Sequence, residues 1–305
     1  AMLLMVLISR CRMDCLTQGI FGLTAAQMIL GTLGVCLLES GVDSVSAVYY
    51  RCVIGGLVLL AYCAWRHDLV SLWELPKREI GLAILSAVLM ITNWVLFFEG
   101  IRLTSIAVAT IVFHVQPFFV VLLGAALLRE RIPLIIFAWI GLALIGLIFA
   151  TGISAGDLGA ASDYTLGLLV TISAALSYAL VTIIAKGLVH TKPHQLTLIQ
   201  CIVGALALGF IAPGEASSYE YQQWGWLLVM GVVHTGGVYI LLYGSLPKLT
   251  TPLIAVLLFV YPASAVIVDA FFYDHHINLL QVAGLATIIL ASLGVTLKWG
   301  QRTIV

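Results

Sequence analysis

The chain has 305 residues, of which 62% are hydrophobic and only 9% are charged, and its mean hydropathy is +1.13. Soluble domains carry about 25% charged residues, so this composition excludes a water-soluble domain and predicts an integral membrane protein. The formal net charge is zero, and nothing indicates a nucleic-acid partner. The six cysteines form no C-x-x-C pair, so we expect no metal, no cofactor and no disulfide framework.

Ten apolar segments follow one another along the chain. They span residues 16–36, 44–65, 79–100, 104–127, 132–151, 165–186, 194–211, 224–244, 250–271 and 278–298. A helix needs about 20 apolar residues to cross a bilayer, and lipid offers the backbone no hydrogen bonds, so each segment is expected to be an α-helix. A transmembrane barrel would need alternating strands of about ten residues. The predicted fold is an all-α membrane protein with ten transmembrane helices.

Basic residues fall on one side of this predicted membrane. All Lys and Arg residues except Arg51 and Arg102 lie in every second gap, counted from the N-terminus. Basic residues near helix ends stay cytoplasmic during insertion. The pattern therefore predicts that both termini are cytoplasmic.

The two halves of the sequence resemble each other. The matched pairs are Arg51–Leu57 with Gln200–Leu206, Gly100 with Gly244, Thr104–Pro117 with Leu249–Pro262, and Gly141–Ala143 with Gly284–Ala286. Each half has five segments, an odd number, so the second half is predicted to insert in the opposite orientation. Inverted repeats are usual in secondary transporters, which hold substrate near the bilayer midplane. A duplicated bundle without a transport role is the alternative interpretation.

We expect four parts in the chain. Residues 1–15 form a cytoplasmic segment, 16–152 the first five-helix repeat, 153–164 an extracytoplasmic linker, and 165–300 the second, inverted repeat. Ala1 precedes Met2, and Met13 stands just before the first segment. Residues 1–12 are therefore either a remnant of cloning or a natural extension.

Several motifs resemble a known superfamily. They are Tyr50-Arg51-Cys52 in the second segment, a fourth segment that runs through Pro117 to Leu128-Arg129-Glu130-Arg131, and Gly167 followed by Ala174–Ala179 in the sixth. Over residues 16–300 the chain resembles ten-helix members of the drug/metabolite transporter superfamily built from two EamA domains, and among them the YddG-like exporters of aromatic amino acids. The resemblance implies export of aromatic and other neutral amino acids across the bacterial inner membrane, without enzymatic activity. One chain of ten helices can enclose a cavity, so we expect a functional monomer.

Family architecture implies a central cavity lined by the first, third, fourth, sixth, eighth and ninth segments. Ten polar or aromatic residues near the middle of these segments are candidates for substrate binding: Gln27, Asn93, Trp94, His114, Gln116, Ser177, Tyr178, His234, Tyr239 and Tyr261. Polar groups that face lipid are costly, so we expect them to face inward. Helix–helix hydrogen bonds, worth about 0.6 kcal/mol, and ordinary aromatic packing are the competing uses. For the two histidines, substrate or proton binding competes with a neutral bond to a neighbouring helix.

Five residues are candidates for gating or hinges: Arg51, Glu99, Pro117, Pro262 and Asp269. Arg51 is expected either to pair with an acid such as Glu99 as an outer gate or to extend toward the membrane surface. The two prolines are expected to kink their helices, as hinges or as static bends. Asp269 is expected to act as a helix-end or gating charge.

The functional prediction is a secondary transporter or facilitator that exports neutral amino acids by alternating access. The alternative is a proton-coupled exporter of drugs or other metabolites, for which His114, His234 and Asp269 are the protonatable candidates. The first segment carries Gln27 where related small multidrug exporters place an acid, which disfavours lipophilic cations. The sequence has no buried cluster of basic residues, which disfavours phosphate substrates. It has no HExxH or G-x-S-x-G motif, which disfavours an enzyme.

Overall fold

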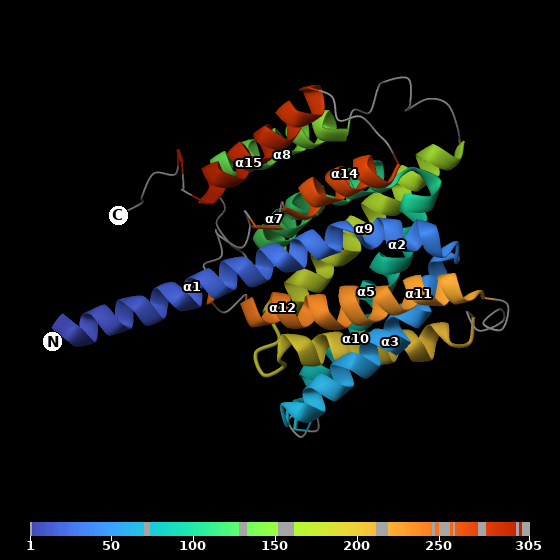
Figure 1. Ribbon diagram of the computed structural model, residues 1–305, viewed down its shortest axis with the longest axis horizontal. Coiled ribbons are helices and arrows are strands. Elements are labelled where there is room, and N and C mark those ends of the chain that lie inside the picture. The colour runs from blue at the N-terminus through green and yellow to red at the C-terminus, as the bar shows by residue number, and fades with distance from the viewer. Residues whose placement is uncertain are drawn as a thin grey trace.

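The computed structural model of the protein is all-helical over the residues it describes, with no strand among them (Figure 1). The described residues are 2–69, 74–127, 133–151, 162–211, 219–245, 260–273 and 279–296, with the short stretches 248–249, 257–258 and 299–300. Most of the predicted linker, residues 153–164, lies outside them.

The helices follow the apolar segments. Those of the first half are α1 (Met2–Gly31), α2 (Leu33–Ser40), α3 (Ser44–Trp65), α5 (Lys77–Leu103), α6 (Ile106–Phe113), α7 (Gln116–Leu127) and α8 (Leu134–Thr151). Those of the second half are α9 (Ser162–Lys186), α10 (Pro193–Leu208), α11 (Tyr221–Val229), the π-helix η2 (Met230–Gly237), α12 (Val238–Ser245), α14 (Val260–Phe272) and α15 (Leu279–Thr296). Helical residues therefore lie in every predicted segment.

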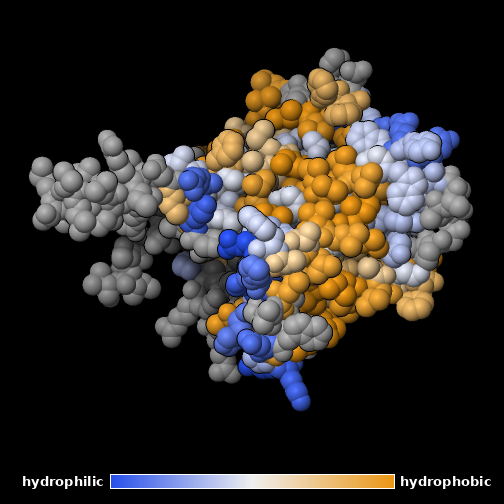
Figure 2. Space-filling model, turned by 60° about the horizontal axis from the view of Figure 1, so that its bottom comes forward, coloured by the Kyte–Doolittle hydropathy of each residue, from blue (hydrophilic) through white to orange (hydrophobic). Residues whose placement is uncertain are grey.

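Five helical spans are long and apolar enough to cross a membrane: Cys15–Ser40, Ser44–Trp65, Lys77–Leu103, Asp163–Ala185 and Tyr221–Leu242. The other apolar helices are shorter. The all-helical fold is thus established for the described residues, whereas ten crossings and the cytoplasmic placement of both termini stay predictions. Figure 2 shows a broad apolar area on one face of the molecule, and large side chains such as Leu57 and Leu206 are exposed, as expected for contact with lipid.

Turn chemistry sets the connection between the first two predicted segments. Gly41 ends α2 with a φ of 61°, a left-handed conformation that glycine adopts without steric cost. Asp43 then caps α3, because its carboxylate accepts hydrogen bonds of 3.0 Å from the backbone N–H groups of Val45 and Ser46. The chain therefore reverses within three residues.

Three predicted helices are interrupted, where the sequence predicted continuous ones. The first breaks at Thr32, between α1 and α2. The fourth breaks at His114 and Val115, just before Pro117, which is the second residue of α7 and tolerates its missing N–H there. The eighth changes to π-helix over Met230–Gly237. Interruptions of this kind are frequent at functional sites.

The helix packing repeats itself between the two halves. The second helices of the halves pack on each other, α3 on α10, and so do the fifth helices, α8 on α15, which lie together at one side of the molecule in Figure 1. The contact of α5 with α9 is matched by that of α12 with α1, and the contact of α7 with α9 by that of α14 with α1. This exchange of partners is what a two-fold axis between α3 and α10 produces.

Candidate functional site

A buried arginine lies at the contact between the two halves. Arg51 of α3 is only 2% exposed. Its Nε donates a 2.7 Å hydrogen bond to the Thr235 hydroxyl of η2, and its guanidinium carbon lies 4.4 Å from the centre of the Trp94 ring of α5. A second ring, Phe98, lies 5.8 Å away. The three elements that meet here come from both halves.

The favourable free energy of the Arg51 contacts is comparable with the free-energy cost of placing an arginine within the membrane. An arginine at a helix centre costs about 2.5–3.5 kcal/mol on insertion scales. A desolvated cation–π contact contributes about 2 kcal/mol, and a hydrogen bond from a charged donor about 1.5–3 kcal/mol. Trp94 and Thr235 can therefore hold the cation at this depth without an acidic partner.

The π-helix η2 supplies a histidine beside Arg51. His234 is 1% exposed. Its Nε2 lies 2.9 Å from the Thr32 hydroxyl at the break between α1 and α2, and its Nδ1 lies 3.3 Å from the Val229 carbonyl oxygen. Two of the three helix interruptions are thus joined by one side-chain contact. The histidine belongs to the second half and the threonine to the first.

Aromatic side chains extend from Arg51 toward the interruption of the fourth predicted helix at His114. Trp94 meets Tyr239 edge-on, with ring centres 6.5 Å apart. Phe113, at the end of α6, lies 5.8 Å from Tyr178. His114 stacks on Tyr261, with ring centres 5.6 Å apart, and its Nδ1 lies 2.6 Å from the Thr110 carbonyl oxygen. We call these residues, with Arg51, Thr235 and His234, the central cluster.

The opposite half repeats the Arg51 contact without its charge. Gln200 of α10 donates through Nε2 to the Ser86 hydroxyl of α5 at 3.0 Å. The sequence separation from Arg51 to Gln200 is 149 residues, and that from Ser86 to Thr235 is also 149 (200 − 51 = 235 − 86). The two pairs join corresponding helices of the two halves, α3 with η2 and α10 with α5. A second-helix residue bonds a third-helix hydroxyl of the opposite half in each case.

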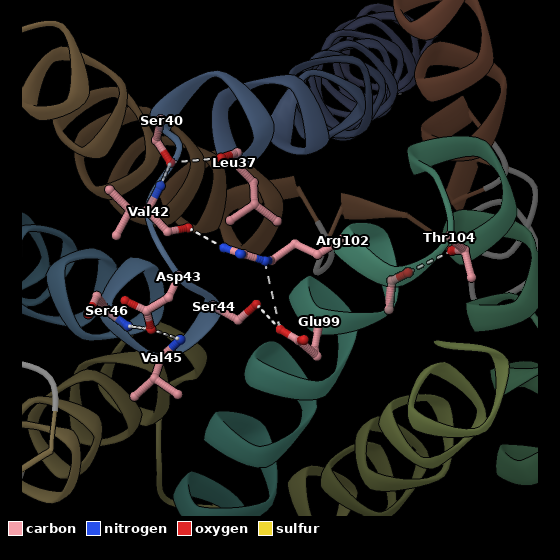
Figure 3. Close-up of polar contacts among 11 residues, drawn as sticks. Leu37, Ser40, Val42, Asp43, Ser44, Val45, Ser46, Glu99, Arg102 and Thr104 are labelled. Carbon is pink, nitrogen blue, oxygen red and sulfur yellow. Dashed lines mark hydrogen bonds and ion pairs between the residues drawn. The ribbon is translucent and has the colours of Figure 1, made fainter. Parts of the chain in front are cut away.

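The predicted pair of Arg51 with Glu99 is wrong. Glu99 accepts a 2.7 Å hydrogen bond from Ser44 and lies 3.9 Å from Arg102 (Figure 3). Arg102 in turn donates to the Val42 carbonyl oxygen at 2.9 Å. Glu99 thus closes a network with the α2–α3 turn, and Arg102 is its basic partner. The alternative prediction for Arg51, extension to the surface, is wrong as well, because the side chain is buried.

Other predicted site residues have structural contacts. Asn93 donates to the Ala174 carbonyl oxygen of α9 at 2.9 Å, the helix–helix use that competes with substrate binding. Ser177 donates within its own helix to the Ser173 carbonyl oxygen. Gln27 is 3% exposed in α1, and half-buried Gln116 is the first residue of α7.

The gating candidates of the ninth segment lie in α14. Pro262 is buried in its first turn, and Asp269 is buried two turns further on. Residues 250–256, which precede Pro262 in the predicted ninth helix, lie outside the described residues. Ser264 donates to the Met28 carbonyl oxygen at 2.9 Å and so fixes α14 against α1.

A polar network joins the halves at the predicted cytoplasmic end. Asp68, after α3, accepts hydrogen bonds from Lys192 and from His194 Nε2, the latter at 2.8 Å. Burial alone would raise the pKa of the Asp68 carboxyl, but the hydrogen bonds from Lys192 and His194 outweigh it and hold this pKa below its usual value. Next to it, Glu79 accepts from His190 Nδ1 at 2.7 Å and from Thr191 at 2.8 Å. We call these residues the inner network.

Sequence reasoning missed the hydroxyl partners of the central cluster. Thr235 and Thr32 were not candidates, although each polar group lies within an apolar segment. Thr235 is found by its contact with Arg51. Thr32 is found only by its contact with His234, which no local pattern encodes.

Comparison with known proteins fits this arrangement. The model of the EamA-like transporter family matches the chain twice, over residues 17–152 and 165–297. The chain belongs to the EamA-like transporter family. It is a multi-pass membrane transporter with two EamA repeats, and the transported substrate of this family is a small molecule.

Relatives of this transporter carry similar names. The chain is 28% identical over 282 residues to "Uncharacterized transporter YxxF" of Bacillus subtilis (strain 168), covering 92% of this chain and 90% of the relative. It is 25% identical over 227 residues to "Pseudopaline exporter CntI" of Pseudomonas aeruginosa (strain UCBPP-PA14), covering 72% and 76%. A solved crystal structure has the same fold, with a TM-score of 0.73 at 18% identity, over 95% of this chain and 99% of that chain.

Proposed function

We propose that this transporter exports amino acids, aromatic and other neutral ones, by alternating access around the central cluster. The proposal is carried by two ring pairs that each join the two halves, Trp94 with Tyr239 and His114 with Tyr261. Trp94, Tyr239 and Tyr261 belong to one buried cluster, beside polar groups. Aromatic rings supply a large apolar contact area, and polar tips orient the bound molecule. The site then suits a small molecule with an apolar body and a polar end.

Alternating access requires contacts at each end that form and break. At the predicted cytoplasmic end these are the inner network. At the other end Gln223 donates to the Ser40 carbonyl oxygen at 3.0 Å, and the Tyr273 hydroxyl donates to Glu39 at 3.2 Å. Each contact joins one half to the other, so opening either end separates the halves there. We infer that the two ends open in turn.

Flux in liposomes tests this function. Purified protein reconstituted into liposomes is expected to move labelled phenylalanine, tryptophan or methionine down a concentration gradient. Trp94→Ala is the matched variant, because it removes the largest ring of the cluster, and Trp65→Ala, whose ring is 74% exposed, is the control. No flux for any amino acid across a full panel would refute the proposal.

We infer that the protein acts as a monomer in the bacterial inner membrane. Flux should therefore persist when each liposome holds about one copy of the protein.

A second candidate is a proton-coupled exporter of another metabolite. The similarity to a pseudopaline exporter favours it, as do the two histidines of the central cluster. An imposed pH gradient separates the two functions. Uphill transport of a metabolite driven by protons, with no amino-acid flux, would replace the first proposal by the second.

A further inference from the structure

Arg51 is a cation whose charge the fold does not require. The same position in the other half is Gln200, a neutral amide that bonds a hydroxyl on the third helix of the opposite half, as Arg51 does. Arg51 and Gln200 both lie where α3 packs against α10, and each bonds the third helix of the opposite half. If packing alone were selected, a neutral residue would serve both positions. The charge at Arg51 therefore points to a ligand.

The guanidinium retains donors for that ligand. It has five N–H donors, of which the Nε–H is used by Thr235. Among the described residues, its side-chain contacts are a hydroxyl and two aromatic rings, and no carboxylate bonds it. The ionisable groups that its charge reaches include Cys52, His234 and Tyr261, none of which is an anion near neutral pH in its ordinary form. None of these three groups therefore neutralises the charge of Arg51.

The depth of Arg51 matches a transport site. It lies seven residues after Ser44, or about 10 Å along α3 at 1.5 Å per residue. The helix has 22 residues, so Arg51 lies within about 6 Å of its midpoint. A substrate held between the halves passes this depth whichever end is open.

We propose that Arg51 is the carboxylate-binding residue of the transport site, and that the substrates are acids with an apolar or aromatic body. The guanidinium fork matches the two oxygens of a carboxylate. Trp94 and Tyr239 lie beside it for the apolar part. This inference rests on the proposed transport function, but it specifies the chemical group that the protein recognises. It excludes simple amines and lipophilic cations as preferred substrates, because they would meet like charge.

Binding to four related compounds tests the inference. Phenylalanine and phenylacetate carry a carboxylate, whereas phenylalanine amide and phenethylamine do not. Apparent affinities come from ligand-induced thermal stabilisation of the full-length protein in detergent. Wild type is expected to bind the two acids more tightly than the two amines, which lack the carboxylate. Arg51→Gln, which copies Gln200, is expected to weaken binding of the acids about 10- to 100-fold, the loss typical of a charged hydrogen bond.

Two further variants make the test specific. Arg51→Lys keeps the charge but loses the fork, so it should retain part of the preference for acids. Gln200→Leu removes the equivalent polar pair of the other half, so it should leave the ratio of acid to amide binding unchanged. If Arg51→Gln fails to fold, the wild-type series and Arg51→Lys decide the question.

The outcomes separate this inference from the proposed function. Equal binding of acids and amide by wild type, binding of none of the four, or acid binding unchanged in Arg51→Gln would overturn the carboxylate site, even while phenylalanine flux continues. Arg51-dependent binding of phenylacetate without binding or flux of any amino acid would support the carboxylate site and remove the amino-acid assignment.

Discussion

The thiols of Cys52 in α3 and Cys201 in α10 lie against each other in the interior. Gly56 packs on Cys201 and Gly204 packs on Cys52. The repeat in the sequence pairs Cys52 with Cys201 as equivalent positions, so a residue here meets its own counterpart. Self-contact of this kind occurs on a two-fold axis, and it places the axis of the two repeats between these cysteines.

Oxidation is expected to join the two halves through this pair. A membrane-permeable oxidant such as iodine would convert the two thiols to one disulfide, taking up the two electrons while two protons are released. With a protease site inserted at residue 157, the cleaved halves should stay together on a denaturing gel until a reductant is added. Cys201→Ala is the control, and its halves should separate. Separation of the wild-type halves without reductant would contradict the axis.

Close helix approach around Arg51 depends on Gly231. A side chain at Gly231 of η2 would collide with Ile54 and with the Gly55 backbone of α3. We therefore expect Gly231→Ala to destabilise the protein by about 1–3 kcal/mol, the cost of overpacking, and to move Thr235 away from Arg51. Thermal unfolding in detergent measures this change. Gly81→Ala, at a position open on all sides, should be neutral or stabilising by up to about 1 kcal/mol.

Composition and repeats were enough to predict the helical fold, because burial in lipid demands long apolar helices and leaves few alternatives. The interruptions at Thr32 and η2 were not predictable in this way. Their residues have no proline, and each break is held by a contact with a distant helix, Thr32 with His234 and Thr235 with Arg51. Local propensity carries no information about such contacts.

The predicted site residues have different surroundings for the same reason. Polarity within an apolar segment correctly marked inward-facing residues such as Trp94 and His234, because lipid penalises polar groups. It did not distinguish a ligand-facing group from one engaged in helix packing, as Asn93 is. Depth along one helix also suggested Glu99 as a partner of Arg51, but Arg102 lies on the same helix face three residues away and takes that role.

Loss of the Asp68 charge is expected to weaken the inner network. Because its pKa is lower in the folded protein than in the unfolded chain, Asp68 contributes stability that is present above its unfolded pKa of about 3.9. That stability is lost as the pH falls through the folded value. The groups that face Asp68 include Lys192, His194 and the Cys63 thiol. Asp68→Asn should therefore destabilise at pH 7 and have a smaller effect near pH 3.

The size and specificity of this effect can be measured together. Removal of a charged hydrogen-bond acceptor costs about 1–3 kcal/mol, so the thermal midpoint at pH 7 should fall by a few degrees. Glu74→Gln makes the same charge change at an exposed residue of the same loop and should leave the midpoint unchanged. An equal loss in both variants would show that net charge, and not the link between Asp68 and Lys192, is responsible.

The histidines of the central cluster are expected to act as neutral hydrogen-bonding groups. His234 contacts Thr32 and His114 stacks on Tyr261, so each already has a partner that needs no charge. His234→Gln and His114→Gln keep a neutral amide in place, and amino-acid flux should persist with an unchanged response to an imposed pH gradient. Thr32→Val is the matched control, because it removes the contact with His234 without removing a titratable group. Loss of gradient-driven uptake in a histidine variant, with the Thr32→Val protein still responsive, would favour the proton-coupled exporter.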